Sequence, residues 1–398
     1  MQKIIFPLSV AALLFTTGCG SKNGQSDSTM TDSTANASAT SSDSASAIVY
    51  QVNNPAAYEG EVNGQAVKLF VLKDGDMTAT LSNFGARIVH LIVPDKNGTP
   101  TDVSLGFKSL ADYRKAKESF FGPVVGRFGN RIAKGQFTLD GKTYQLELNN
   151  NGNTLHGGPS GFHNQVWTAK QTGDKSVEMT YVSKDGEGGF PGTVTTKVTF
   201  TLENKGLKID YVATTDKATP YNPTSHGFFN LNGEGSGTVN NHLMQINADR
   251  YSVIDAGLIP QGEPASVEGT PFDFRKPTTI GARVDEKNEQ LTFAKGYDHN
   301  FVLNRKNADE LTEACVVTGD KSGITMKVLT TEPAMQFYGG NFFAGQDTGK
   351  YGRAINFREG LALEAQHYPD SPNHPTYPST ILKPGQTYRQ TTVYQFGK

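Results

Sequence analysis

The chain has 398 residues and a formal net charge of −2, so it lacks the excess of Lys and Arg that marks a nucleic-acid-binding protein. Charged residues make up only 19%, whereas glycine reaches 43 residues, a balance that favours many strands and turns over long helices. The length would suit two or three domains of ordinary size, although an all-β fold can be this long as one unit.

Residues 1–18 have the features of an export signal. Lys3 supplies a positive start, residues 4–15 form an apolar run, and residues 16–18 are small. The run is too short for a retained membrane span. Because a small-residue segment that ends in Gly-Cys resembles a bacterial lipoprotein signal, we expect a lipid on Cys19 and a location in the periplasm or cell envelope. Thr16 replaces the aliphatic residue usual in that signal, so simple secretion is the alternative.

Residues 19–47 consist mainly of Ser, Thr, Ala, Asp and Asn. Such a segment buries too little apolar surface to offset its ordering entropy, and we predict a disordered tether. Residues 48–398 are then the folded part. Cys315 is the only cysteine besides Cys19, so no internal disulfide is expected if Cys19 is lipidated. Because Cys315 lies in an apolar run, it is predicted to be a buried, unreactive core residue.

From Val49 onward the pattern is one of strands separated by turns. Alternating apolar residues on both sides of Asp140-Gly141 predict a two-residue hairpin. Asn204-Lys205-Gly206 is expected to join two longer strands. The expected strands are residues 177–182, 194–202, 207–214, 242–246, 324–330, 334–338 and 361–366, and the only expected helix is within residues 109–118. Since helical patterns do not separate the strands, we predict an all-β fold, a large antiparallel β-sandwich.

Residues 360–379 combine a strand with a proline-rich loop. The strand alternates apolar positions with polar ones, so Glu364 and Gln366 point the same way. The four prolines that follow predict a stiff, irregular loop. A carboxylate beside such a loop is typical of a functional site, and an exposed Glu on a surface strand is the alternative.

Four polar clusters interrupt the expected strands. They carry Asn130 and Arg131, His156, His226, and Asp298 among glycines and aromatic residues. Planar donors and acceptors mixed with aromatic rings suit a sugar. His226 and Glu364 are the best acid-base candidates, because unperturbed pKa values near 6.5 and 4.3 let a protonated His and an ionised Glu coexist below neutrality. Contact between them is expected to widen that range.

Other chemistries lack their motifs. The chain contains no G-x-S-x-G, Walker-type or strand-to-helix G-x-G-x-x-G sequence. No H-E-x-x-H or C-x-x-C is present, and His156 with His163 is a weak metal pair. We therefore expect neither a cofactor nor a metal.

Several motifs in order, GRFGNRIAKG, NGNTLHGG, PTSHGFFNLNG, YDHNFVL, PAMQFYGGNF and GLALEAQHYPDSPNHPTYPS, resemble the aldose 1-epimerase, or galactose mutarotase, family. The resemblance covers about residues 67–394. It implies one large β-sandwich domain over residues 48–398 and interconversion of the α and β anomers of free hexoses such as galactose and glucose. It implies no cofactor.

Position by position, the resemblance implies that Glu364 is the catalytic base and His226 the catalytic acid. The implied sugar-binding residues are Asn130, Arg131, His156, Asp298 and Gln336, with Phe228 in the His226 motif. Ser225 and Phe228 depart from the family, which usually has Asn and Tyr there, and the departure puts the orientation of His226 in doubt.

Three alternatives stay open. A glycoside hydrolase would need two carboxylates, for example Glu364 and Asp298. A non-catalytic, lipid-anchored sugar-binding protein would use the same pocket without chemistry. A hexose-phosphate mutarotase would need an additional Arg cluster, which the sequence does not display.

Overall fold

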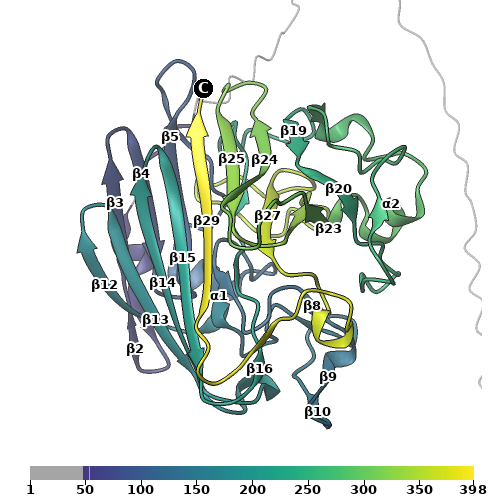
Figure 1. The fold of residues 1–398 in the computed structure, drawn as a ribbon. Helices are drawn as coiled ribbons and strands as arrows, with labels where there is room; N and C mark the ends of the chain where they lie inside the picture. Colours follow the sequence, from purple (N-terminus) through teal and green to yellow (C-terminus); the bar gives the residue numbers. More distant parts are fainter. Residues whose placement is uncertain (1–47, 53) are drawn as a thin grey trace, which may run out of the picture. The chain divides into compact units, whose positions relative to one another are not determined.

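Three antiparallel sheets build the body of the protein in the computed structural model, which describes residues 48–52 and 54–398 (Figure 1). The predicted export signal, the tether and Cys19 lie outside the described residues. None of the described helices is long and apolar enough to cross a membrane.

The largest sheet has nine strands in the order β12-β13-β14-β15-β29-β25-β24-β19-β22. Figure 1 shows β29, in yellow, between β15 and β25. The bounds are β12 (Thr168–Gly173), β13 (Ser176–Ser183), β14 (Val194–Glu203), β15 (Gly206–Thr215), β29 (Tyr388–Gly397), β25 (Thr325–Thr330), β24 (Thr312–Thr318), β19 (Leu243–Ile246) and β22 (Thr278–Thr279).

A six-stranded sheet carries the C-terminal half of the site, and a four-stranded sheet comes from the N-terminal part. The first contains β18 (Phe228–Phe229), β27 (Leu361–Gln366), β26 (Ala334–Tyr338), β23 (Asp298–Leu303), β20 (Ala248–Tyr251) and β21 (Ala265–Ser266), in that order. The second contains β3 (Leu69–Asp74), β4 (Met77–Ser82), β5 (Arg87–Pro94) and β6 (Pro100–Asp102).

Short ribbons and helices complete the described fold. The ribbons are β1 (Gly60–Val62) with β2 (Gln65–Val67), β7 (Val124–Val125) with β17 (Thr224–Ser225), β8 (Arg131–Ile132) with β11 (Thr154–Leu155), β9 (Gln136–Leu139) with β10 (Lys142–Gln145), and β16 (Thr219–Pro220) with β28 (Ile381–Leu382). The α-helices are α1 (Leu110–Lys115) and α2 (Glu289–Ala294); 3-10 turns occur at Pro55–Tyr58, Ala133–Gly135, Phe162–Asn164, Glu187–Gly189, Ile280–Ala282 and Ser371–Asn373.

The predicted all-β fold is confirmed, and the strands expected in the sequence lie within about two residues of those observed. Helix α1 begins after Ser109, whose Oγ accepts a hydrogen bond from the Asp112 amide at 3.1 Å. The prediction of a single helix is wrong, because α2 follows Asn288. The Asn288 side chain caps that helix through the Gln290 amide at 2.9 Å.

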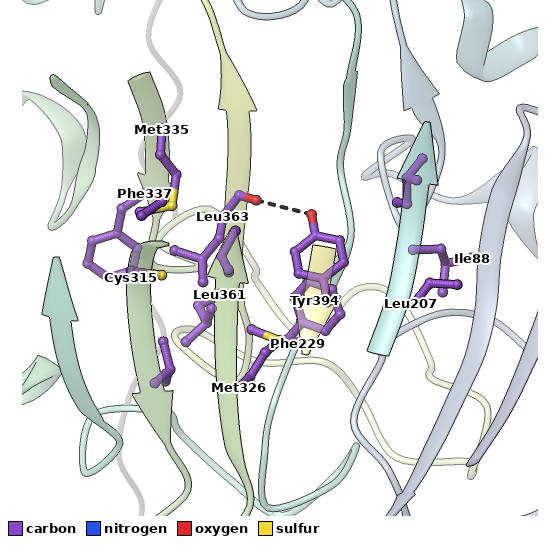
Figure 2. Packing of buried hydrophobic residues seen from close by; sticks show 14 of the residues in the cluster. Ile88, Leu207, Phe229, Cys315, Met326, Met335, Phe337, Leu361, Leu363 and Tyr394 are labelled. Atoms are coloured by element: carbon purple, nitrogen blue, oxygen red, sulfur yellow. Dashed lines mark hydrogen bonds between the residues drawn. The ribbon is translucent and has the colours of Figure 1, made fainter. Parts of the chain in front are cut away.

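The hydrophobic core lies between the sheets and explains how β27 is oriented. Tyr394 on β29 donates a hydrogen bond to the carbonyl oxygen of Leu363 on β27 at 3.2 Å, and Leu361 packs nearby (Figure 2). Because side chains alternate along a strand, Glu364 points away from this core. Cys315 is buried in the same core, as predicted.

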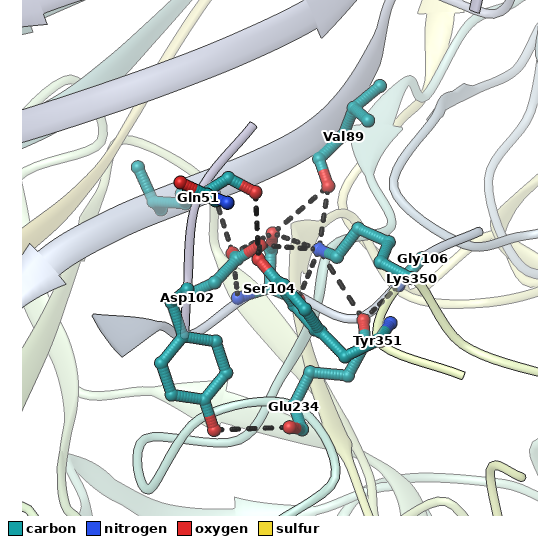
Figure 3. A network of polar contacts seen from close by, with 10 residues as sticks. Gln51, Val89, Asp102, Ser104, Gly106, Glu234, Lys350 and Tyr351 are labelled. Atoms are coloured by element: carbon teal, nitrogen blue, oxygen red, sulfur yellow. Dashed lines mark hydrogen bonds and ion pairs between the residues drawn. The ribbon is translucent and has the colours of Figure 1, made fainter. Parts of the chain in front are cut away.

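A buried polar network joins segments that are far apart in the sequence (Figure 3). Lys350 Nζ lies 2.9 Å from Asp102 Oδ2 and 3.4 Å from Glu234 Oε2, and it donates to the carbonyl oxygens of Val89 and Ser104. Both carboxylates and the ammonium are almost fully buried. The network therefore ties the loop around Lys350, which follows the Phe342 segment, to strands β5 and β6.

Candidate active site

A cavity of about 550 Å³ collects residues from all four predicted polar clusters and from β27. Six of the predicted site residues line it: Asn130, Arg131, His156, His226, Asp298 and Glu364. Two others, Phe228 and Gln336, do not line it. Such a volume is in the range of small-molecule sites and accommodates one pyranose ring.

Strand pairing brings His226 to Glu364. β18 begins two residues after His226 and pairs with β27, so that Phe228 lies opposite Ala362. His226 Nε2 is then 3.5 Å from Glu364 Oε1. Glu364 is only 2% exposed, so the alternative of an exposed Glu on a surface strand is wrong.

His156 is held by a reciprocal contact with Asn130. The Asn130 amide donates to His156 Nδ1 at 3.1 Å, and the His156 amide donates to the Asn130 carbonyl oxygen. Both residues have a left-handed backbone, with φ of 64° and 53°. Next to His156, Gly157 approaches the carbonyl oxygen of Gly126 so closely that any Cβ would overlap it, which accounts for this glycine of the His-Gly-Gly motif.

Asp298 is fixed by two neighbours. Gln336 on β26 donates to its Oδ1 at 2.6 Å, and Arg131 Nη1 lies 3.9 Å from its Oδ2. Arg131 also donates from Nε to Asn150 Oδ1 at 3.1 Å. Gln336 stands directly opposite Glu364 in the register of β26 and β27. Its side chain thus holds Asp298 and does not line the cavity, and the sugar contact predicted for Gln336 stays a prediction.

Phe228 also lies behind the site. Its ring is fully buried and meets the His226 ring edge to face at 4.9 Å, with Phe121 and Phe343 on its other sides. In this apolar setting a phenyl ring needs no hydrogen-bond partner. The ring of Phe228 therefore supports His226, and the sugar contact predicted for Phe228 stays a prediction.

Phe120 is an aromatic residue of the cavity that was not among the predicted site residues. The structure brings Phe120 over the three histidines of the cavity, with ring centroids 4.6 Å from His156, 4.7 Å from His163 and 5.8 Å from His226. Tyr338 and Phe342 line the cavity as well. The Phe-Phe pair before Gly122 was the available signal, although such pairs are common in ordinary cores.

Burial shifts the pKa values of His226 and Glu364 in the direction opposite to the one expected from contact between the two groups. It lowers the pKa of His226 to about 4. Burial, and then the negative charge of Asp298, raise the pKa of Glu364 well above its usual value, while Arg131 opposes that rise. The expectation of a stable His⁺/Glu⁻ pair in the free protein is therefore wrong, because burial favours the neutral form of each group.

His156, His226 and Glu364 place three donor atoms within 4.8 Å of one another, the arrangement of a potential metal site. The tautomer of His156 disfavours metal binding at this place. Because its Nδ1 accepts the Asn130 amide, the neutral ring carries its hydrogen on Nε2, and a nitrogen that bears hydrogen cannot ligate a metal. The residues suit a sugar oxygen better than a cation.

Comparison with known proteins gives a consistent result. The family model for aldose 1-epimerase matches residues 68–395. Galactose mutarotase from Bos taurus is 42% identical over 330 residues, which cover 83% of this chain and 94% of that protein. Aldose 1-epimerase from Escherichia coli is 39% identical over 338 residues, or 84% of this chain and 96% of that protein. A crystal structure of an aldose epimerase homologue from C. elegans is 30% identical with a TM-score of 0.77, covering 83% of this chain and 99% of that chain.

Proposed function

The chain belongs to the aldose 1-epimerase family, and we propose that it interconverts the α and β anomers of free hexoses with His226 and Glu364 as the acid-base pair. The single observation that supports these roles is the 3.5 Å separation of the imidazole and the carboxylate in one buried cavity. Opening a hemiacetal requires one proton to leave O1 and one to reach the ring oxygen. Two such groups side by side meet that need.

In the ring-opening step, Glu364 accepts the proton of the C1 hydroxyl while His226 donates a proton to the ring oxygen. The bond between C1 and the ring oxygen breaks and the C1 carbonyl forms. After rotation about the C1–C2 bond, the hydroxyl attacks the other face of the carbonyl. His226 recovers its proton and Glu364 returns one to O1, so both groups end as they began.

The free and the reactive protonation states carry the same number of protons. Burial favours a protonated Glu364 beside a neutral His226, whereas the reaction starts from the carboxylate and the imidazolium. Moving one proton between the two groups converts one state into the other without exchange with solvent. Sugar hydroxyls that donate to Glu364 stabilise its charged form and so favour the reactive state.

The remaining residues anchor the ring away from C1. Arg131, Asp298 and the Nε2 hydrogen of His156 offer complementary donors and acceptors, and Phe120 offers an aromatic face. Contacts remote from C1 let the site accept both anomers. We propose galactose and glucose as substrates on this basis.

Polarimetry of freshly dissolved α-galactose and α-glucose tests the function. Wild-type protein is expected to accelerate the approach to the equilibrium rotation, and Glu364→Gln and His226→Asn to lose most of that acceleration. Binding of sugar without acceleration would favour the non-catalytic alternative. Release of reducing sugar from an oligosaccharide would favour the hydrolase.

We also propose that the enzyme is exported and anchored by a lipid on Cys19, a proposal supported by the small-residue segment that precedes this cysteine. Radioactive palmitate is expected to label the wild-type protein in cells and not Cys19→Ser. Release of an unlabelled wild-type protein would instead favour simple secretion.

A further inference from the structure

A second cavity, of about 850 Å³, lies apart from the active site and shares no lining residue with it. It is bounded by Arg305 from the loop after β23, by the turn between β25 and β26, and by the C-terminal segment around residues 378–389. His367, which directly follows β27, also lines it. None of the roles assigned to the active site uses these residues.

Arg305 is the lining residue whose environment indicates a ligand site. Its Nε and Nη2 atoms are buried and have no hydrogen-bond partner among the described residues. A guanidinium is a cation that carries five N–H donors in a fixed plane. Leaving such donors buried and unpaired costs free energy. An acceptor from outside the chain removes that cost, and a negative charge does so best.

Glu332 is the buried carboxylate that lines this cavity, and both of its oxygens already have donors. It is 2% exposed, its Oε2 lies 2.5 Å from His367 Nδ1, and its Oε1 accepts a hydrogen bond from Tyr388 at 2.9 Å. Both oxygens are thus occupied by other donors. The contact also fixes the His367 ring, whose Nε2 is the nitrogen that Glu332 leaves available.

Two further lining residues add to the site. The Thr380 side chain is 6% exposed and its Oγ1 has no hydrogen-bond partner among the described residues. Arg389 lines the cavity with an exposed side chain. Asp309 is the acidic lining residue besides Glu332, and it balances only one of the two arginines.

We propose that this cavity binds an oxyanion, a phosphate or a carboxylate group, through Arg305, His367 and Thr380. A planar guanidinium pairs with two oxygens of such a group, and the Thr380 hydroxyl donates to another. Because the Nδ1 hydrogen of His367 is bound to Glu332, His367 donates from Nε2 as the imidazolium. A neutral sugar fits less well, because it would leave the charge of Arg305 uncompensated. The proposal goes beyond the mutarotase function and does not depend on it.

Isothermal titration of the full chain with inorganic phosphate, and separately with acetate, tests the proposal at constant ionic strength. We expect saturable binding of one ion per chain for at least one of the two, and the stronger binder identifies the group that the site prefers. Arg305→Gln should weaken that binding at least about tenfold, and Thr380→Val should weaken it less. The matched control Arg114→Gln, an exposed arginine on α1, should leave it unchanged.

Three results would overturn the proposal: no saturable binding of either ion to the wild type, equal affinity in Arg305→Gln, or displacement of the ion by galactose. Glu364→Gln should bind the ion as the wild type does, so the outcome is separable from that of the mutarotase assay. Unchanged mutarotation by Arg305→Gln would show that this variant is folded.

Discussion

His226 and Glu364 come from distant parts of the chain, yet their Nε2 and Oε1 atoms lie 3.5 Å apart. The pairing of β18 with β27 produces this contact, since it fixes the residues just after His226 against the residues just before Glu364. Backbone hydrogen bonds therefore set the acid-base distance, and the two side chains need little reorganisation to act on one ring.

Glu364→Gln is expected to lower the rate of anomer exchange by a factor on the order of 10² to 10⁴, because an amide cannot accept the O1 proton. The same variant should be at least as stable as the wild type at pH 8. The pKa of Glu364 is higher in the folded protein than in the unfolded chain, so its contribution to stability falls as pH rises toward the folded pKa. Urea unfolding at pH 5 and pH 8 measures this difference.

The exposed Glu61 provides a control, since Glu61→Gln should alter neither the rate nor the pH dependence of unfolding. A Glu364→Gln protein that exchanges anomers at a near-normal rate would remove Glu364 from the mechanism. One that loses stability more strongly at pH 8 than at pH 5 would show that the carboxylate is favourable where it is buried.

Asp298→Asn is expected to move the basic limb of the kcat/KM profile to lower pH. The reactive state carries one proton on the His226–Glu364 pair, and the pair loses that proton at the raised pKa of Glu364. The negative charge of Asp298 raises this pKa, so removing the charge lowers it. KM should rise about tenfold or more, because a charged sugar contact is lost. Polarimetric rates from about pH 5 to pH 10 test both effects, and a basic limb that stays in place or moves upward would contradict the role given to Asp298.

Local patterns were enough to predict much of the fold. Strict alternation marked β14 and β15, and the left-handed pair Asn204 and Lys205 forms the turn expected between them. Helix α2 was missed although it is as long as α1, since six residues hold less than two helical turns and such a short pattern is ambiguous. Its stability comes from contacts distant in sequence, such as the Gln290 side chain bound to the backbone of Ile254.

Only those features of the site that belong to sequence motifs could be predicted. His226 and Glu364, which we propose as the acid-base pair, and four of the predicted sugar contacts line the cavity. That Phe228 and Gln336 lie behind this layer depends on packing, which no residue pattern reveals. The pKa shifts of His226 and Glu364 were expected in the wrong direction, because spacing along a chain contains no information about desolvation.

His299→Gln is expected to make the protein less sensitive to acid. Burial lowers the pKa of His299 to about 3, below the unperturbed value near 6.5, so the unfolded chain binds this proton first and stability is lost as pH falls below 6.5. At pH 5 that loss is about 2 kcal/mol relative to pH 8. Gln has no such proton and can still accept the Asp298 amide that His299 Nδ1 accepts.

The difference in free energy of unfolding between wild type and His299→Gln, followed over pH, reports on His299 alone. Burial also raises the pKa of Glu118 and of Glu234, each to about 7, and these carboxyls change stability in the opposite direction as pH falls. Both contribute equally to wild type and variant. Free energies of unfolding that run parallel from pH 8 to pH 5 would mean that His299 takes up its proton in the folded state.

Lys350→Met is expected to destabilise the protein by about 3 to 5 kcal/mol, because it leaves the carboxylates of Asp102 and Glu234 buried without their cation. Adding Glu234→Gln should recover part of the loss, since one of the two unpaired charges is removed. Lys208→Met, which breaks a partly exposed pair with Asp210, should cost at most about 1 kcal/mol. Urea unfolding at pH 7.5 compares the four proteins. Equal losses for Lys350→Met and Lys208→Met would show that the buried network contributes no more than a surface ion pair.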